Sequence, residues 1–110
     1  MKTMTDKELK IENARWQTSV MLRALDVRGC DNQMVQTMEE CDELAVAVSH
    51  LRRFRTAEAR QEMIGEIADV EIMLEQMKME FDCHQEVAAK VVEKLARLER
   101  KLDKNAGENL

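Results

Sequence analysis

Two short acidic clusters contain the residues of this chain that are best suited to chemistry. They span residues 39–43, Glu-Glu-Cys-Asp-Glu, and residues 66–69, Glu-Ile-Ala-Asp. Within each cluster two carboxylates lie three residues apart, which places both on one face of a helix. These paired acids are Glu40 with Glu43, and Glu66 with Asp69. Because gathered oxygen ligands favour Mg²⁺ or Mn²⁺, two such helices packed together would form a divalent-metal site.

Acidic residues at this spacing are also common on solvated helix faces, and two features favour a buried cluster instead. Glu40 precedes Leu44 by one turn, and Glu66 precedes Val70 by one turn, so both acids lie at edges of apolar stripes. An uncompensated charge is unfavourable there. The clusters also lie at comparable distances from a connection near Thr56, so antiparallel helices would set them side by side.

The composition predicts that helices position these acids. The 110 residues include no Pro, no Tyr and only 3 Gly, whereas 9 Met and many Ala, Leu, Glu, Lys and Arg favour helix. We expect one all-α domain over residues 5–103, followed by a disordered tail over 104–110. Only 3% of residues are aromatic, so the core is aliphatic and a partner subunit is expected to complete it.

Apolar periodicity predicts four helices. The first begins at a capping-box pattern, Thr5 with Glu8, and runs to about Asp26, before a break at 28–32 in which Gly29 can end a helix. The others are expected over about 32–53, over 57–81 with Thr56 as its cap, and from the break at 82–85 to about 103. The second helix has two expected core stripes: the first is Met34, Met38, Cys41, Ala45 and Val48, and the second is Leu44, Ala47 and Leu51. The expected stripe of the third helix is Met63, Ile67, Val70, Leu74, Met77 and Phe81. The expected stripe of the fourth helix is Ala88, Val91, Leu95, Leu98 and Leu102.

Charge and cysteine content narrow the range of functions. The formal net charge of -5 does not suit a nucleic-acid binder, although metal ions can bridge an acidic protein to phosphates. The 3 cysteines are an odd number without paired spacing, which favours a reduced, cytoplasmic setting. No apolar run reaches transmembrane length, and the N-terminus lacks a signal-peptide core, so we expect no membrane partner.

The acidic motif, Glu-Glu-x-x-Glu at 39–43 followed by Glu-x-x-Asp at 66–69, resembles the signature of the all-α NTP pyrophosphatases. The resemblance is closest to MazG-like nucleotide pyrophosphohydrolases of the small, single-domain type, and covers about residues 15–102. Gln33, before the first cluster, and the basic segment 94–101 resemble further features of that family. Dimeric dUTPase-like enzymes, dCTP pyrophosphatases and phosphoribosyl-ATP pyrophosphatases share the acids and differ elsewhere.

The resemblance implies an oligomeric, four-helix bundle-like fold and a Mg²⁺-dependent enzyme, with Mn²⁺ as an alternative ion. Such an enzyme hydrolyses a nucleoside triphosphate, NTP or dNTP, to the monophosphate and pyrophosphate as a homodimer or homotetramer. The metal would neutralise the triphosphate and activate a water. The implied metal ligands are Glu40, Glu43, Glu66 and Asp69.

Other roles follow from the same resemblance. Glu39 or Glu43 would accept the proton of the attacking water. Lys94 and Arg97 would contact phosphate oxygens, with a neighbouring subunit as one possible source. Gln33 and Trp16 would recognise the base, although packing in the core is the alternative for Trp16.

Two other classes of function remain open from the sequence. The first is a non-enzymatic helical module that dimerises or binds through its apolar stripes, with its acids solvated. The second is a protein that keeps the fold without efficient turnover. His50 and His84 lack the spacing of a zinc site and are interpreted as structural or exposed.

Overall fold

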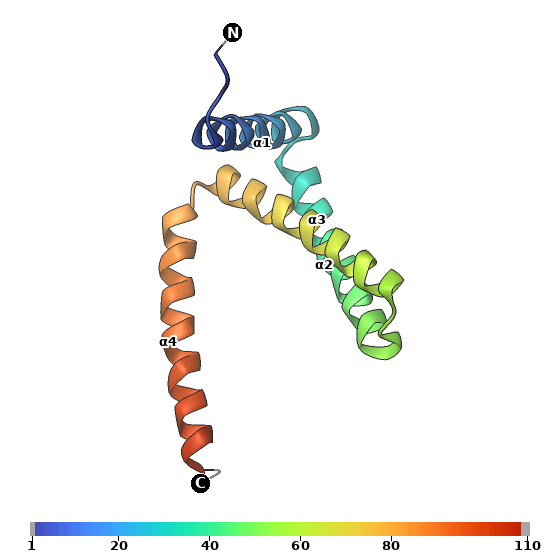
Figure 1. The fold of residues 1–110 in the computed structure, drawn as a ribbon, viewed down its shortest axis with the longest axis vertical. Helices are drawn as coiled ribbons and strands as arrows, with labels where there is room; N and C mark the ends of the chain where they lie inside the picture. The colour runs from blue at the N-terminus through green and yellow to red at the C-terminus, as the bar shows by residue number, and fades with distance from the viewer. Residues whose placement is uncertain (1, 109–110) are drawn as a thin grey trace. The chain divides into compact units, whose positions relative to one another are not determined.

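The computed structural model describes residues 2–108, which form four α-helices and no strand (Figure 1). The helices are α1 (Asp6–Arg28), α2 (Cys30–Phe54), α3 (Ala57–Phe81) and α4 (His84–Glu108). The prediction of an all-α protein with four helices is therefore confirmed. Among these helices, none combines the length and the apolar character that a membrane crossing requires.

The chain divides into two compact units, Met1–Glu80 and Phe81–Leu110. The single domain expected over 5–103 stays a prediction. In the second unit α4 continues to Glu108, whereas the sequence predicts a disordered tail from residue 104. The reason is that no proline interrupts residues 104–108 and the only glycine there lies at the penultimate position, so helix propagates. Residues 109–110 lie outside the described part.

The ends of α1 follow the predicted capping. Thr5 Oγ1 accepts the backbone N–H of Glu8 at 3.1 Å, and Glu8 Oε2 accepts that of Thr5 at 3.2 Å. Gly29 ends the helix at φ 87°, and its N–H donates to the carbonyl of Leu25 at 2.9 Å. A positive φ is accessible to glycine without strain, so Gly29 can separate α1 from α2 in a single residue.

A two-residue turn joins α2 and α3. Arg55 adopts the left-handed conformation, φ 52°, and its N–H donates to the carbonyl of Leu51 at 3.0 Å. Thr56 Oγ1 then accepts the N–H of Ala59 at 3.1 Å, which confirms Thr56 as the cap of α3. So short a connection makes the two helices antiparallel neighbours.

Two contacts fix the register of this antiparallel pair. Near the turn, His50 Nδ1 lies 3.5 Å from Glu62 Oε1. At the far end, Gln33 Nε2 donates to Gln76 Oε1 at 2.6 Å, and both amides are buried. The residue order is reversed between the two contacts, as antiparallel packing requires. The acidic clusters lie between these contacts on both helices.

The packed faces of α2 and α3 follow three- and four-residue steps. Their buried and half-buried positions include Gln33, Thr37, Glu40, Leu44, Ala47 and Leu51 on α2, and Ala59, Met63, Glu66, Val70, Met73, Gln76 and Met77 on α3. The second stripe predicted for α2 is thus confirmed. The first is wrong for the single chain, because all its members are exposed, namely Met34, Met38, Cys41, Ala45 and Val48. On α3 the predicted stripe is half right, because Ile67, Leu74 and Phe81 are exposed.

Candidate metal centre

Glu40 and Glu66 occupy the middle of the packed faces of α2 and α3. Each takes a position at which an apolar side chain is expected, because Leu44 follows Glu40 and Val70 follows Glu66 on the same face. The Oε2 atoms of both glutamates are buried and have no hydrogen-bond partner among the described residues. Buried carboxylate oxygens without a partner are unfavourable, and a cation held between the helices would satisfy both of them.

A third carboxylate completes the cluster. One carboxylate oxygen from each of Glu40, Glu43 and Glu66 lies within 4.8 Å of those of the other two. Glu43 is one turn beyond Glu40 on α2 and is exposed, so the cluster opens to solvent on its side. We call these three residues the carboxylate cluster. Two half-buried ligands and one at the surface suit an ion that must also meet a dissolved substrate.

Gln36 holds one of the buried carboxylates in place. Its Nε2 donates to Glu40 Oε1 at 2.7 Å across one turn of α2. This contact occupies one oxygen of Glu40 and leaves the other, Oε2, available inside the cluster. A hydrogen bond of this kind orients a ligand for a metal from outside the coordination sphere.

The electrostatics of the cluster are those of acids held too close together. The pKa of Glu43 is raised above its ordinary value, first by the charge of Glu40 and then by loss of solvent. The pKa of Glu66 is raised mainly by loss of solvent, and then by the charges of Glu43, Asp69 and Glu40. Both directions follow from like charges in a partly dehydrated site. A divalent cation between the oxygens would reverse these effects.

Among residues 2–108, no Lys, Arg or His side chain performs that neutralisation. Over residues 2–108, none of Glu40, Glu43, Glu66 and Asp69 forms an ion pair with a Lys, Arg or His side chain. The donor set is all oxygen, with two buried oxygens lacking partners. These residues therefore fit a hard divalent ion such as Mg²⁺ or Mn²⁺.

The other two predicted acids lie beside the cluster. Asp69 is outside the three-residue group but close enough for its charge to act on Glu43 and Glu66. It is exposed, one turn beyond Glu66 on α3. Glu39 is exposed on α2, one turn before Glu43, and is also outside the group. The structure therefore brings together three of the four predicted ligands and places the fourth at their edge.

Gln33 has a structural role in this chain. Its side chain is 2% exposed and bonds to Gln76, which is 3% exposed, so it joins α2 to α3. Its contact with a base stays a prediction, and binding would require this pair to open. Gln36, rather than Gln33, is the glutamine that touches the cluster. The sequence signal that could have identified it is its position four residues before Glu40.

Trp16 lies on a different surface from the acids. It is 65% exposed and lines a groove of about 670 Å³ between α1 and α3, so core packing is wrong for the single chain. The α3 residues of the groove include Ala68, Ile72 and Glu75, which occupy the face of α3 opposite Glu66 by helical period. The structure therefore does not bring Trp16 to the cluster of its own chain.

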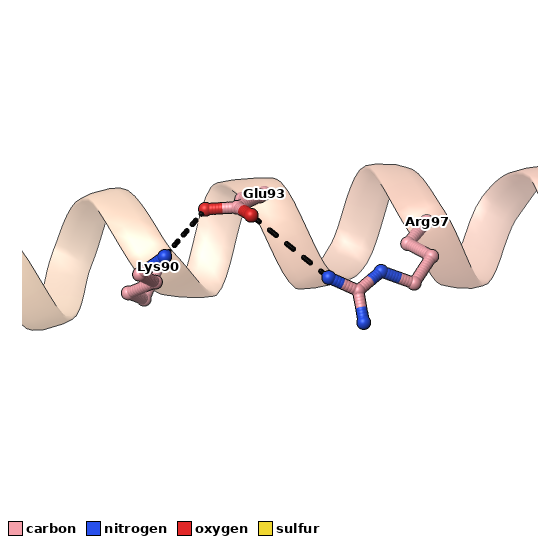
Figure 2. A network of polar contacts seen from close by, with 3 residues as sticks. All are labelled: Lys90, Glu93 and Arg97. Atoms are coloured by element: carbon pink, nitrogen blue, oxygen red, sulfur yellow. Dashed lines mark hydrogen bonds and ion pairs between the residues drawn. The ribbon is translucent and has the colours of Figure 1, made fainter.

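Lys94 and Arg97 belong to the second unit, on α4. Arg97 Nη2 lies 3.9 Å from Glu93 Oε1, and Lys90 Nζ lies 3.1 Å from Glu93 Oε2 (Figure 2). Lys94 has no hydrogen bond or ion pair within residues 2–108. The phosphate contacts predicted for both side chains stay predictions.

Comparison with known proteins finds no family model that matches this chain, and no similar curated protein or solved structure. The assignment of a function therefore depends on the residues and geometry described above.

Proposed function

We propose that this protein is a Mg²⁺-dependent nucleoside triphosphate pyrophosphohydrolase of the MazG-like kind. The observation that carries the proposal is the pair of buried, partnerless Oε2 atoms of Glu40 and Glu66, one from each helix. A helical module with merely solvated acids has no reason to place two carboxylates at core positions. A metal site explains both their burial and their convergence on Glu43.

Glu40, Glu43 and Glu66 would hold the ion, with Asp69 at the edge of the site. A bound Mg²⁺ supplies charge neutralisation for a triphosphate and activation of water for attack on a phosphoanhydride. This chemistry also accounts for an anionic substrate at an acidic protein whose net charge is -5. The products would be a nucleoside monophosphate and pyrophosphate.

The burial of each side chain indicates whether it would position a metal ligand or transfer a proton. Gln36 orients Glu40 through the 2.7 Å hydrogen bond, and Glu66 contributes its buried Oε2 atom from α3. Glu43 reaches solvent and has a raised pKa, so it is suited to accept a proton from an attacking water. Glu39, one turn earlier on the same exposed side, is the alternative acceptor.

We include in the same proposal the arrangement of the four helices and the assembly of the subunits. A four-helix bundle-like arrangement in a homodimer or homotetramer would cover the apolar side chains that one chain leaves exposed. Phosphate contacts by Lys94 and Arg97, and base contacts by Trp16, would then come from whichever subunit brings them near the cluster.

The direct test is pyrophosphate release from a panel of NTPs and dNTPs with Mg²⁺, with Mn²⁺ and with EDTA. The wild type is compared with Glu66→Gln and with Glu58→Gln, a matched control on the exposed first turn of α3. We expect metal-dependent release that falls at least about a hundredfold in Glu66→Gln and is unchanged in the control. Absence of release from every nucleotide by folded protein would contradict the proposal.

A non-enzymatic oligomerisation or binding module is the second candidate. It is favoured by α4, whose apolar residues are all exposed and whose Arg97 already pairs with Glu93. The two candidates differ in metal binding, because solvated acids would not bind a divalent ion tightly. Metal binding without turnover would instead indicate a protein that retains the site and has lost efficient catalysis.

A further inference from the structure

One side of α4 carries an apolar stripe, which Val87 and Val92 flank, and the rest of its surface is mostly polar. The helix has 25 residues, and its apolar positions recur at three- and four-residue steps. The stripe consists of Ala88, Val91, Leu95, Leu98 and Leu102, and every member is exposed. In heptad notation Ala88, Leu95 and Leu102 take position a, and Val91 and Leu98 take position d. Such a stripe is the seam by which a helix pairs with another helix.

The ion pairs along α4 lie on the side away from this seam. Glu93 takes the outermost heptad position, f, and its partners Lys90 and Arg97 both take position c (Figure 2). These contacts leave the seam and its two flanks open. The charged flanking residues are Lys94 and Lys101 at position g and Glu99 at position e. Lys94 and Glu99 have no hydrogen bond or ion pair within residues 2–108.

From this arrangement we infer that α4 pairs in parallel with α4 of a second copy of the chain. In a parallel pair, position g of one helix faces position e of the next heptad on its partner. Lys94 then faces Glu99 of the second copy, and the symmetry of the pair repeats this contact. The charges of Lys94 and Glu99 are then satisfied together on either side of the seam, while Lys101 faces the uncharged Ala106 of the second copy.

An antiparallel pair does not offer this match. It sets position g against position g, so Lys94 would face Lys94 or Lys101 of the other copy across the seam. Like charges at these positions are destabilising by about as much as opposite charges are stabilising. The charge pattern therefore selects the parallel orientation, and it also selects a second copy of α4 as the occupant of the stripe.

Site-specific cross-linking tests the orientation. The natural cysteines, Cys30, Cys41 and Cys83, are replaced by alanine, and Val91→Cys is introduced into the full chain. Parallel pairing brings residue 91 beside its own symmetry copy, so mild oxidation should yield a disulfide-linked dimer. Antiparallel pairing would instead cross-link a mixture of Val91→Cys and Leu102→Cys chains. That result, or no cross-link at all in folded protein, would overturn the inference.

Charge exchange tests the partner contact separately. Lys94→Glu and Glu99→Lys each place like charges across the parallel seam, so each variant alone should associate about tenfold more weakly by sedimentation. Mixed together, the two variants should form mixed dimers in preference to either homodimer, because both contacts are then restored. Random mixing would overturn the inference. A phosphate-binding role of Lys94 predicts no such rescue, so the two roles are distinguished.

Discussion

At the scale of single residues, the informative feature is where the glutamates lie rather than how many there are. Glu40 and Glu66 take core positions on facing helices and leave one buried oxygen each without a partner. Glu43 meets them from the exposed side. Folding tolerates such a site only at a cost in stability, and a bound cation offsets that cost.

The raised pKa values predict how this cost depends on pH. Because the folded, metal-free chain holds protons on Glu43 and Glu66 more readily than the unfolded chain, both acids favour folding most at or below the ordinary glutamate pKa. Their contribution is lost as pH rises through the raised values. Glu66→Gln should therefore melt above the wild type in EDTA, by a margin that grows from about pH 4 to neutral pH. A margin that stays constant or shrinks would contradict the assignment.

The sequence predicted this site only in part, and the reasons are physical. Spacing and antiparallel packing were enough to bring Glu40, Glu43 and Glu66 together. The role of Gln36 was missed because a glutamine one turn from an acid is common on solvated helices. The position of Trp16 was missed because apolar periodicity within α1 does not reveal which face of α3 that helix meets.

At the scale of elements, the hairpin of α2 and α3 positions the carboxylate cluster. Turn chemistry was readable in the sequence, because Gly29 and Thr56 end and begin helices by local interactions. The packed faces were not readable by hydrophobicity alone. Each contains a buried glutamine and a half-buried glutamate, so a search for apolar residues selected the neighbouring, exposed stripe on α2. Polar residues at core positions interrupt the apolar pattern, so the helical period of the packed face is not visible in the hydrophobicity of the sequence.

The buried amide pair should contribute measurably to the hairpin. Gln33→Ala leaves Gln76 Oε1 without its 2.6 Å donor and removes packed atoms, so we expect a loss of about 2–3 kcal/mol in the free energy of unfolding. Replacing both glutamines by leucine should restore most of it, because no buried polar group is then orphaned. Urea unfolding of the single and double variants checks this. Additive losses would show that the two amides act independently.

The turn offers a second test with a control two positions away. Arg55 has φ 52°, which costs a non-glycine residue about 1 kcal/mol, so Arg55→Gly should stabilise the chain by up to about that amount. Arg53→Gly lies inside α2 and should destabilise it by about 0.5–1 kcal/mol. Thermal melts of both variants measure the contrast. Destabilisation by both would argue against the left-handed turn.

At the scale of the whole molecule, the hairpin has two unlike sides. On both α2 and α3 an exposed apolar stripe lies beside the packed face, represented by Met38 on α2 and Leu74 on α3. Viewed along each helix from its N-terminus, the stripe is displaced from the packed face in the same rotational direction on both helices. Glu43 and Asp69 are rotated in the opposite sense. Because the two helices run antiparallel, residues displaced in the same rotational direction on each helix lie on the same side of the hairpin. One side of the hairpin is therefore apolar, and the other side carries the acids. An exposed apolar side of this kind predicts self-association.

A charge placed on the apolar side should weaken that association. If the chain self-associates through this side, Met38→Glu is expected to raise the dissociation constant for self-association by at least about tenfold, because burial of an unpaired carboxylate is unfavourable. Val35→Glu is the matched control, since Val35 is exposed on the face of α2 opposite the packed residue Leu44. Sedimentation equilibrium compares the two. Equal weakening by both variants, or none by either, would place the interface elsewhere.

The central claim, that the carboxylate cluster binds a divalent cation, is tested most directly by Mn²⁺ binding followed by electron paramagnetic resonance at neutral pH. We expect saturable binding by the wild type, competition by Mg²⁺ and full binding by the Glu58→Gln control. The Glu40→Gln, Glu66→Gln double variant, which is expected to fold because no buried charge remains at those positions, should bind none. Binding that survives in the folded double variant, or that is absent from the wild type, would contradict the account.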